Sequence, residues 1–254
     1  MQIGPDNLAM REYIYSLIDP AGVKSVLDIG CGVGEDLLRI GGRLPGATRL
    51  VGVDCSGKAI AAANEAAPAD NRYEFVAHDV SMGMPFEDSE FDLAYSLNFL
   101  ECVADKQALI QEMGRVLHSG GQVICGHFDW DTQVFEGVDK ALVRKIVHAF
   151  ADWQQGWMAN ADGWMGRRLW REFQKAGGFA GKIETYVLAN TEYAEPLYGH
   201  MMAHSFEGLV RQGKITQDEY AAFRQEIDQL AKAGRYFYSI NMYIYTGRKA
   251  EPCK

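Results

Sequence analysis

Three glycines at alternate positions, Gly30, Gly32 and Gly34, stand between an apolar run and a segment with helical spacing. Glycine allows a sharp backbone turn and leaves no Cβ between the main chain and a ligand. In parallel α/β folds such a turn lies at the carboxyl ends of the strands, where ligands bind. The sequence therefore predicts a ligand-binding loop here.

The acidic residues around this loop indicate the charge of its ligand. A dinucleotide fingerprint G-x-G-x-x-G would need its third glycine at position 35, where the chain has Glu35, followed by Asp36. Carboxylates at a helix N-terminus would repel a pyrophosphate, and Asp28 adds another negative group. S-adenosylmethionine carries a sulfonium and an ammonium and no phosphate, so it suits this loop better than NAD or FAD.

Two further acidic residues follow apolar runs. Asp54 ends the run 49–53 and is placed to bind both hydroxyls of a ribose, although it could instead cap the helix that begins near Ser56. Asp79 follows the run 73–77 and could accept the exocyclic amine of adenine, while Val80 offers a backbone amide. A lone aspartate after a strand is also a common turn residue, so the register of Asp79 carries more weight than its type.

These residues need a framework of alternating strands and helices. The first half of the chain shows strand and helix signals at short intervals, which is typical of a parallel sheet covered on both faces. We expect an α/β fold with strands at 24–29, 49–53, 73–77, 91–95 and 121–126, and helices at 6–18, 35–44, 56–67 and 105–117.

The second half of the chain has longer amphipathic segments. They predict helices at 138–157, 166–176, 196–211 and 216–233, and strands at 182–189 and 236–245. No linker or repeat divides the 254 residues, so we expect a single domain over 1–254. Its cofactor-binding core would cover about 20–128, and a helical substrate cap about 129–165 and 191–234.

The motifs Val26–Gly34, Val51–Asp54, His78–Val80 and Phe91–Phe99 resemble, in order and spacing, those of the class I S-adenosylmethionine-dependent methyltransferases. The resemblance is closest to the branch with ubiquinone, menaquinone and many natural-product methyltransferases, and it covers about 20–128. It implies a Rossmann-like, mostly parallel sheet of seven strands whose last strand is antiparallel.

The same resemblance implies roles for particular residues. The methionine end of the cofactor would lie at Asp28 and at the loop, the ribose at Asp54 and Cys55, and the adenine at Asp79 and Val80. Arg11 could reach the cofactor carboxylate, and a surface salt bridge is an equally good interpretation of it. The full cofactor-binding set is Asp28, Gly30, Cys31, Gly32, Gly34, Asp54, Cys55, Asp79, Val80, Ser96, Asn98, Phe99 and Arg11.

The acceptor side offers mainly aromatic residues. All five tryptophans lie between positions 130 and 170, and tryptophan stacks on planar or cationic groups. Some of them could equally seal the cap against the sheet. The predicted acceptor-binding residues are Trp130, Trp153, Trp157, Trp164, Tyr193 and His200.

Histidines offer the remaining chemistry. His127, just before Trp130, is the candidate general base, because imidazole titrates near neutral pH; it could instead be a structural, hydrogen-bonded histidine. His200 and His204 have metal-ligand spacing, with Glu207 nearby. No third ligand is recognisable, so we expect no metal site.

Composition narrows the class of protein. The net charge is −9 and there is no Lys/Arg run, so we expect neither nucleic acid nor a membrane as partner. The five cysteines include no C-x-x-C pair, the first ten residues lack a signal peptide, and no apolar stretch reaches 18 residues. We therefore expect a cytoplasmic protein, monomeric or homodimeric.

The sequence thus predicts a methyltransferase that modifies a small, aromatic or heteroaromatic metabolite, as in natural-product biosynthesis. It leaves open the identity of the acceptor, and whether oxygen, nitrogen or carbon is methylated. A nucleic-acid methyltransferase is disfavoured by the charge and by Ser96–Phe99, which lacks a proline-proline-aromatic motif. Two further alternatives stay open: an NAD-dependent oxidoreductase, and a catalytically silent subunit that binds the cofactor, which the intact cofactor motifs disfavour.

Overall fold

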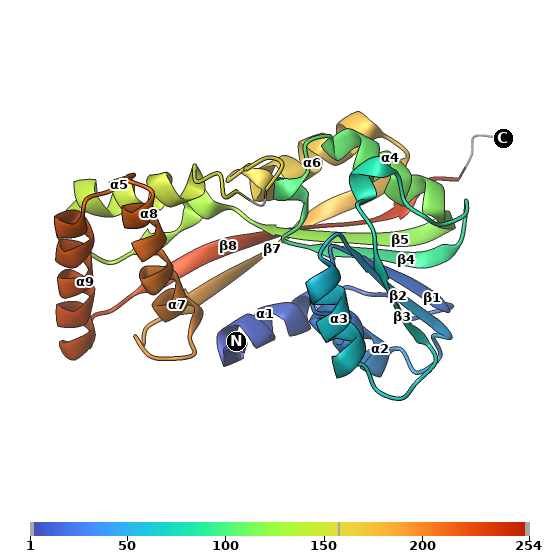
Figure 1. The fold of residues 1–254 in the computed structure, drawn as a ribbon, viewed down its shortest axis with the longest axis horizontal. Coiled ribbons are helices and arrows are strands. Elements are labelled where there is room, and N and C mark those ends of the chain that lie inside the picture. The colour runs from blue at the N-terminus through green and yellow to red at the C-terminus, as the bar shows by residue number, and fades with distance from the viewer. Residues whose placement is uncertain (1–2, 157, 252–254) are drawn as a thin grey trace.

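A single twisted sheet with helices on both faces forms the framework of the protein (Figure 1). The computed structural model describes residues 3–156 and 158–251. Five parallel strands lie in the order β3-β2-β1-β4-β5, which confirms the predicted α/β class. Their bounds are β1 Ser25–Ile29, β2 Arg49–Asp54, β3 Tyr73–Ala77, β4 Phe91–Leu97 and β5 Leu117–Phe128.

Helices cover the sheet in two layers (Figure 1). One face carries α1 (Pro5–Ser16), α2 (Glu35–Arg43) and α3 (Gly57–Ala66), and the other carries α4 (Lys106–Val116) and α6 (Met165–Ala176). All residues of β1 are buried between these layers, as expected for a central parallel strand. Ser56 Oγ accepts a hydrogen bond from the Ala59 amide at 3.2 Å and caps α3.

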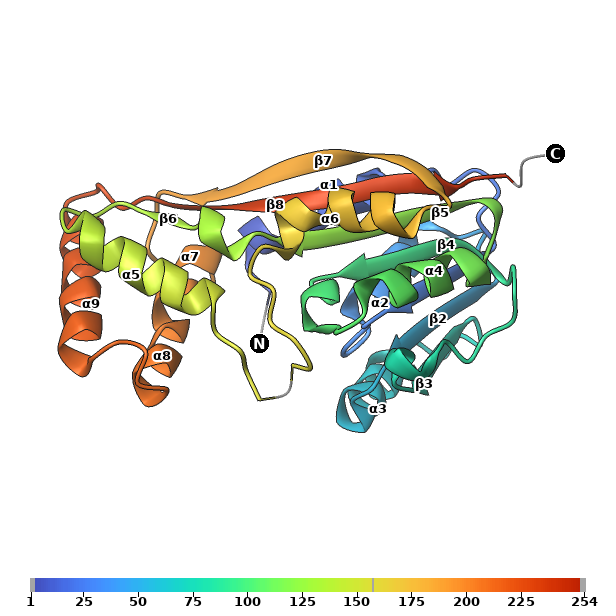
Figure 2. The ribbon, with the colours of Figure 1, turned by 90° about the horizontal axis from the view of Figure 1, so that it is seen from above.

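The C-terminal part of the sheet is antiparallel (Figure 2). Strand β8 (Tyr238–Lys249) pairs with β5 on one side and, over its whole length, with β7 (Phe179–Asn190) on the other. The last strand is therefore antiparallel, as predicted. An additional two-residue strand, β6 (Val134–Phe135), pairs with the start of β8 beyond the end of β5.

The remaining helices gather beyond one end of the sheet (Figures 1 and 2). They are α5 (Lys140–Ala151), α7 (Tyr198–Ser205), α8 (Glu207–Arg211) and α9 (Gln217–Lys232), here called the cap helices. Among the described residues, no helix is both long and apolar enough to cross a membrane.

The predicted bounds of two helices in the cap are wrong. The helix predicted over 138–157 ends at Ala151, because Trp153 packs instead over Gly208, where a Cβ would lie 2.5 Å from the indole ring. The helix predicted over 196–211 is divided at Phe206, whose fully buried ring packs against Phe135 and Phe223. In both places the burial of an aromatic ring overrides the helical spacing.

Candidate functional site

The glycine loop lies at the carboxyl ends of the parallel strands and is tied to both of its neighbours. The backbone amides of Gly30 and Cys31 donate to the Val53 carbonyl of β2 at 2.8 and 3.1 Å. On the other side, Ser96 Oγ of β4 donates to the Ile29 carbonyl at 2.9 Å. The loop is therefore fixed before any ligand binds.

The three glycines of this loop serve different purposes. All have positive φ angles, 75° at Gly30, 53° at Gly32 and 78° at Gly34. A Cβ at Gly30 would lie 2.4 Å from the ring of Phe99, and one at Gly34 would lie 2.6 Å from the ring of Phe75. Only at Gly32 would a Cβ meet nothing within 4 Å, so Gly32 alone of the three faces open space that a ligand can occupy.

Asp28 places a buried carboxyl group beside this loop. Its side chain belongs to a residue only 2% exposed, and Oδ2 has no hydrogen-bond partner in the described structure. Burial, and then the nearby Asp36 carboxylate, hold the pKa of Asp28 well above its usual range. An unpartnered buried carboxylate oxygen is costly, and a cationic ligand would relieve that cost.

The two acidic residues at the start of α2 are paired within the protein. Asp36 accepts hydrogen bonds from Arg11 Nη1 and from the Tyr15 hydroxyl, both on α1, and Glu35 pairs with Arg39 at 3.0 Å. The Arg11 side chain is only 17% exposed. Its ion pair is therefore an internal tie between α1 and α2 rather than a surface salt bridge.

Asp54 shapes the loop from the end of β2. Its Oδ2 accepts a hydrogen bond from the Gly32 amide at 2.9 Å, and its Oδ1 accepts one from the Ser56 amide at 2.8 Å. The N-cap of α3 is Ser56, so Asp54 does not cap that helix. It holds the backbone of Gly32 in the position that leaves the space open.

The other predicted cofactor residues lie at or near the same edge. Asp79 accepts a hydrogen bond from the Ser81 amide at 2.9 Å and caps the short helix Val80–Met82. The Ser81 side chain, followed by this amide, lowers the pKa of Asp79. Asn98 Oδ1 accepts a hydrogen bond from the Phe128 amide at 3.1 Å and ties the ends of β4 and β5 together. Cys31 and Val80 are buried, whereas Cys55 is exposed.

A buried polar cluster lies at the end of β5. His127 is 1% exposed, and its Nδ1 donates to the Phe128 carbonyl at 2.7 Å. Nε2 is then the ring nitrogen left to accept a proton, and it lies 3.7 Å from Glu101 Oε2. The same oxygen accepts a hydrogen bond from Trp130 Nε1 at 2.6 Å.

Sequence reasoning missed Glu101. This residue is 6% exposed and lies in the short helix Leu100–Cys102, which follows β4. Its signal was present in the sequence, since Glu101 is the only charged residue in the run Phe99–Val103. A lone carboxylate in an apolar turn must find polar partners once it is buried.

The predicted aromatic acceptor residues do not form one wall. Trp130 and Trp153 line, with Glu101, a small cavity of about 30 Å³. Trp164 lies apart; it is 43% exposed, and the guanidinium carbon of Arg167 is 4.7 Å from the centre of its ring. The predicted acceptor residue Trp157 lies outside the described residues.

A second group of aromatic residues lies between α1 and the cap helices. The rings of Tyr193 and His200 are 4.7 Å apart between centres. His200 also lines a larger cavity of about 740 Å³, between the start of α1 and residues 195–205. Among residues 3–156 and 158–251, no group of three His, Cys, Asp or Glu side chains could hold a metal ion.

Comparison with known proteins gives matches to methyltransferases. Residues 27–125 match the methyltransferase domain family. An uncharacterized 37.1 kDa protein in transposon TN4556 of Streptomyces fradiae is 27% identical over 93% of this chain and 66% of its own length. Ajmaline N-methyltransferase of Rauvolfia serpentina is 28% identical over 53% of this chain and 46% of its own length. The match thus covers less than two thirds of each relative.

A solved structure resembles nearly the whole chain. The YcgJ protein from Bacillus subtilis has a TM-score of 0.62 at 16% identity, and the match covers 96% of this chain and 100% of that one. This likeness shows the fold, while the domain match and the named relatives confirm the resemblance and the predicted cofactor. Residues 27–125 of the chain thus match the methyltransferase domain family, which supports the predicted resemblance to the class I S-adenosylmethionine-dependent methyltransferases.

Proposed function

We propose that this protein transfers the methyl group of S-adenosylmethionine to a small aromatic or heteroaromatic metabolite. The single observation that carries the cofactor assignment is the pairing of the open space at Gly32 with the unpartnered Oδ2 of Asp28. Together they offer room and negative charge to a cationic ligand. The group that the cofactor supplies when bound is an electrophilic methyl on a sulfonium.

The chain's own residues would bind and orient the reactants. Asp28 would accept a hydrogen bond from the cofactor ammonium, and Asp54 would bind its ribose while holding the Gly32 amide. Asp79 and Val80 would border the adenine. Methyl transfer is an in-line displacement, so correct positioning and the exclusion of water supply much of the rate.

His127 would act only if the acceptor must lose a proton. Its Nε2 would accept that proton, because Nδ1 donates to the Phe128 carbonyl, and Glu101 at 3.7 Å would stabilise the resulting imidazolium. Trp130 and Trp153 would border the acceptor near the end of β5. The cap at 129–165 and 191–234 would thus be the acceptor-binding part of one domain.

The similarity to ajmaline N-methyltransferase, a relative with an assigned activity, supports a small-molecule acceptor. The net charge of −9 disfavours nucleic acid. We place the protein in the cytoplasm, as a monomer or homodimer, in natural-product biosynthesis.

The test is binding followed by turnover. Calorimetry should show binding of S-adenosylmethionine and S-adenosylhomocysteine, and none of NADH. Incubation of a metabolite extract with methyl-deuterated S-adenosylmethionine should yield a labelled small molecule in mass spectrometry, and His127→Ala controls would show whether a titrating base is needed. Binding of NADH in place of S-adenosylmethionine would overturn the proposal, and cofactor binding without any labelled product would favour a silent subunit.

A further inference from the structure

A cavity large enough to hold a metabolite lies between α1 and the cap helices. Its volume of about 740 Å³ falls within the range usual for small-molecule sites. We propose that this cavity holds the body of the methyl acceptor, and that the acceptor is an uncharged or cationic aromatic molecule rather than an anion. This inference rests on the proposed function.

The charge of the cavity wall selects against anions. The described lining contains no lysine or arginine, and Glu195 brings a negative charge to its exposed outer end. Two histidines, His200 and His204, also line the cavity, and burial followed by the neighbouring His204 lowers the pKa of His200. Since an unpaired anion is costly to desolvate, a phosphate or carboxylate would be disfavoured by a described lining without lysine or arginine.

The remaining wall suits a planar ring. Leu197, Tyr198 and Met201 supply aliphatic, aromatic and thioether surface, and Asn7 and Ser205 supply hydrogen-bonding groups. Apolar walls with a few polar groups are typical of sites that bind such ligands. The thioether of methionine adapts to ligand shape and makes favourable contacts with aromatic rings.

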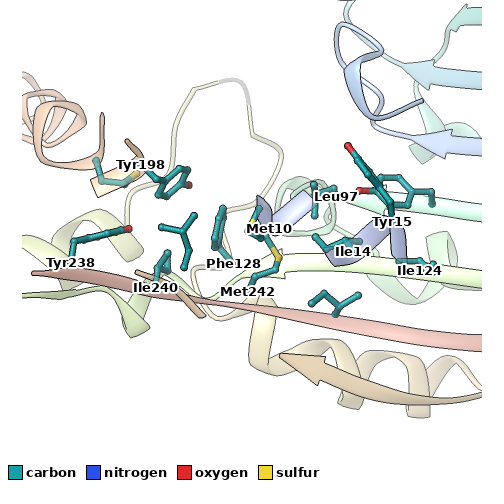
Figure 3. Packing of buried hydrophobic residues seen from close by; sticks show 14 of the residues in the cluster. Met10, Ile14, Tyr15, Leu97, Ile124, Phe128, Tyr198, Tyr238, Ile240 and Met242 are labelled. Carbon is teal, nitrogen blue, oxygen red and sulfur yellow. The ribbon is translucent and has the colours of Figure 1, made fainter. Parts of the chain in front are cut away.

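The Tyr198 side of the cavity lies near the end of β5. The ring of Tyr198 lies 5.0 Å from that of Phe128, the last residue of β5. Figure 3 shows Tyr198, Phe128 and Leu97 following one another from the cap toward the ends of β4 and β5. An acceptor in this cavity would therefore lie one pair of packed aromatic rings away from the end of β5.

The two walls of the cavity are held in fixed positions. Asp6 Oδ2, on α1, accepts hydrogen bonds from the Tyr198 amide and from Asn190 Nδ2, both at 2.8 Å. One turn further along α1, Arg11 Nε donates to Asn7 Oδ1 at 3.3 Å while Arg11 Nη1 binds Asp36. Helix α1 thus connects the cavity wall to the cofactor loop, and the cavity is formed before the acceptor enters.

The test uses three probes that share an indole ring and differ in charge: tryptamine, tryptophol and indole-3-propionate. Calorimetry on the complex with S-adenosylhomocysteine should show binding of tryptamine and tryptophol, with indole-3-propionate at least about tenfold weaker, a difference of about 1.4 kcal/mol. Glu195→Gln should weaken tryptamine about threefold, the scale of an exposed ion pair, and leave tryptophol unchanged. Glu192→Gln is the matched control.

Filling the cavity should remove the site. Met201→Trp, or Ser205→Trp one turn later, should weaken tryptophol binding at least about tenfold, whereas Val138→Trp, at an exposed position just before α5, should not. All variants should keep the S-adenosylhomocysteine affinity of the unaltered protein, which verifies their folding.

The outcomes separate the two proposals. Equal or tighter binding of indole-3-propionate, full tryptophol binding in both tryptophan variants, or binding of no probe at all would overturn this inference while leaving the cofactor assignment intact. Absence of S-adenosylhomocysteine binding by the unaltered protein would instead overturn the proposed function.

Discussion

The loop edge of the sheet and the cap helices are built in opposite ways. At the edge, Gly32 faces open space and Asp28 keeps a carboxylate oxygen without a partner. In the cap, the ring of Phe135 packs within 5.3–5.6 Å of Phe206 and Phe223. Open space and unpaired charge cost stability, whereas packed rings supply it. Changes at the edge should therefore alter ligand binding, and changes toward the cap should alter stability.

The largest effect is expected at Gly32. Gly32→Val would fill the open space, so it should abolish the thermal stabilisation that S-adenosylhomocysteine produces. The backbone strain at a φ of 53° should also cost roughly 1–3 kcal/mol of unfolding free energy. Gly22→Val is the matched control, since Gly22 has a φ of 77° and equally open surroundings. If ligand stabilisation survives in Gly32→Val, the space at Gly32 is not the cofactor site.

The next largest effect is expected at Asp54. Asp54→Ala removes both the ribose contact and the acceptor of the Gly32 amide, so cofactor affinity should fall by about 1.5–3 kcal/mol, or roughly 10- to 150-fold. Asp139→Ala is the control, because Asp139 likewise accepts two backbone amides but caps α5. Isothermal calorimetry measures the cofactor affinity of both variants. Equal affinities would contradict the claim that changes at the loop edge, and not in the cap, alter ligand binding.

A pH dependence should follow from Asp28. Its raised pKa means that the folded apoprotein holds a proton that the unfolded chain releases at lower pH. The stability that this proton contributes is complete below the unfolded pKa of about 3.9 and is lost as pH rises through the folded pKa. A cationic ligand favours the ionised carboxylate, so cofactor affinity should increase over the same pH window.

Asp28→Asn separates these two effects. The variant should bind the cofactor about tenfold more weakly at neutral pH, or about 1.4 kcal/mol, without the pH dependence of binding. Its apoprotein should unfold at a higher urea concentration than the unaltered protein at neutral pH, and this gain should vanish below about pH 4. A loss of stability at neutral pH would show that the Asp28 carboxylate is a structural partner and not a ligand-binding group.

The smallest effect on cofactor binding is expected at Trp130. Trp130→Phe keeps the aromatic packing and removes the donor to buried Glu101, so unfolding free energy should fall by about 1–3 kcal/mol. Trp164→Phe removes a similar bond to Asp131 at an exposed position and should cost about 0.5 kcal/mol or less. Urea titrations of both variants, with and without S-adenosylhomocysteine, would measure their stability and cofactor binding. A large drop in cofactor affinity for Trp130→Phe would contradict the expectation that changes toward the cap alter mainly stability.

The first half of the fold could be predicted because its signals are local. Each predicted strand up to β5 is a short apolar run, and Ser56 caps the helix that it was expected to cap. The glycine loop was found in the same way, although spacing alone could not separate Gly32 from Gly30. That distinction depends on Phe99, which reaches Gly30 from the end of another strand.

The second half could not be predicted as well because distant contacts decide it. The end of α5 depends on Trp153 meeting Gly208, and the break after α7 depends on the buried ring of Phe206. Strand β6 exists because two residues meet the start of β8. The role of Glu101 could not be predicted, because it depends on contacts with His127 and Trp130, which are distant in the sequence.

The late pairing of strand β8 is expected to expose this chain to aggregation while it folds. Residues 238–249 close the sheet by joining β5 to β7 (Figure 2), and their partners in β5 lie far away in the sequence. Such distant pairing is slow. Until it happens, β5 and β7 keep free edges that can pair with other chains. We therefore expect aggregation during refolding to rise with protein concentration, and to be relieved by added peptide 238–249 if that edge is the cause.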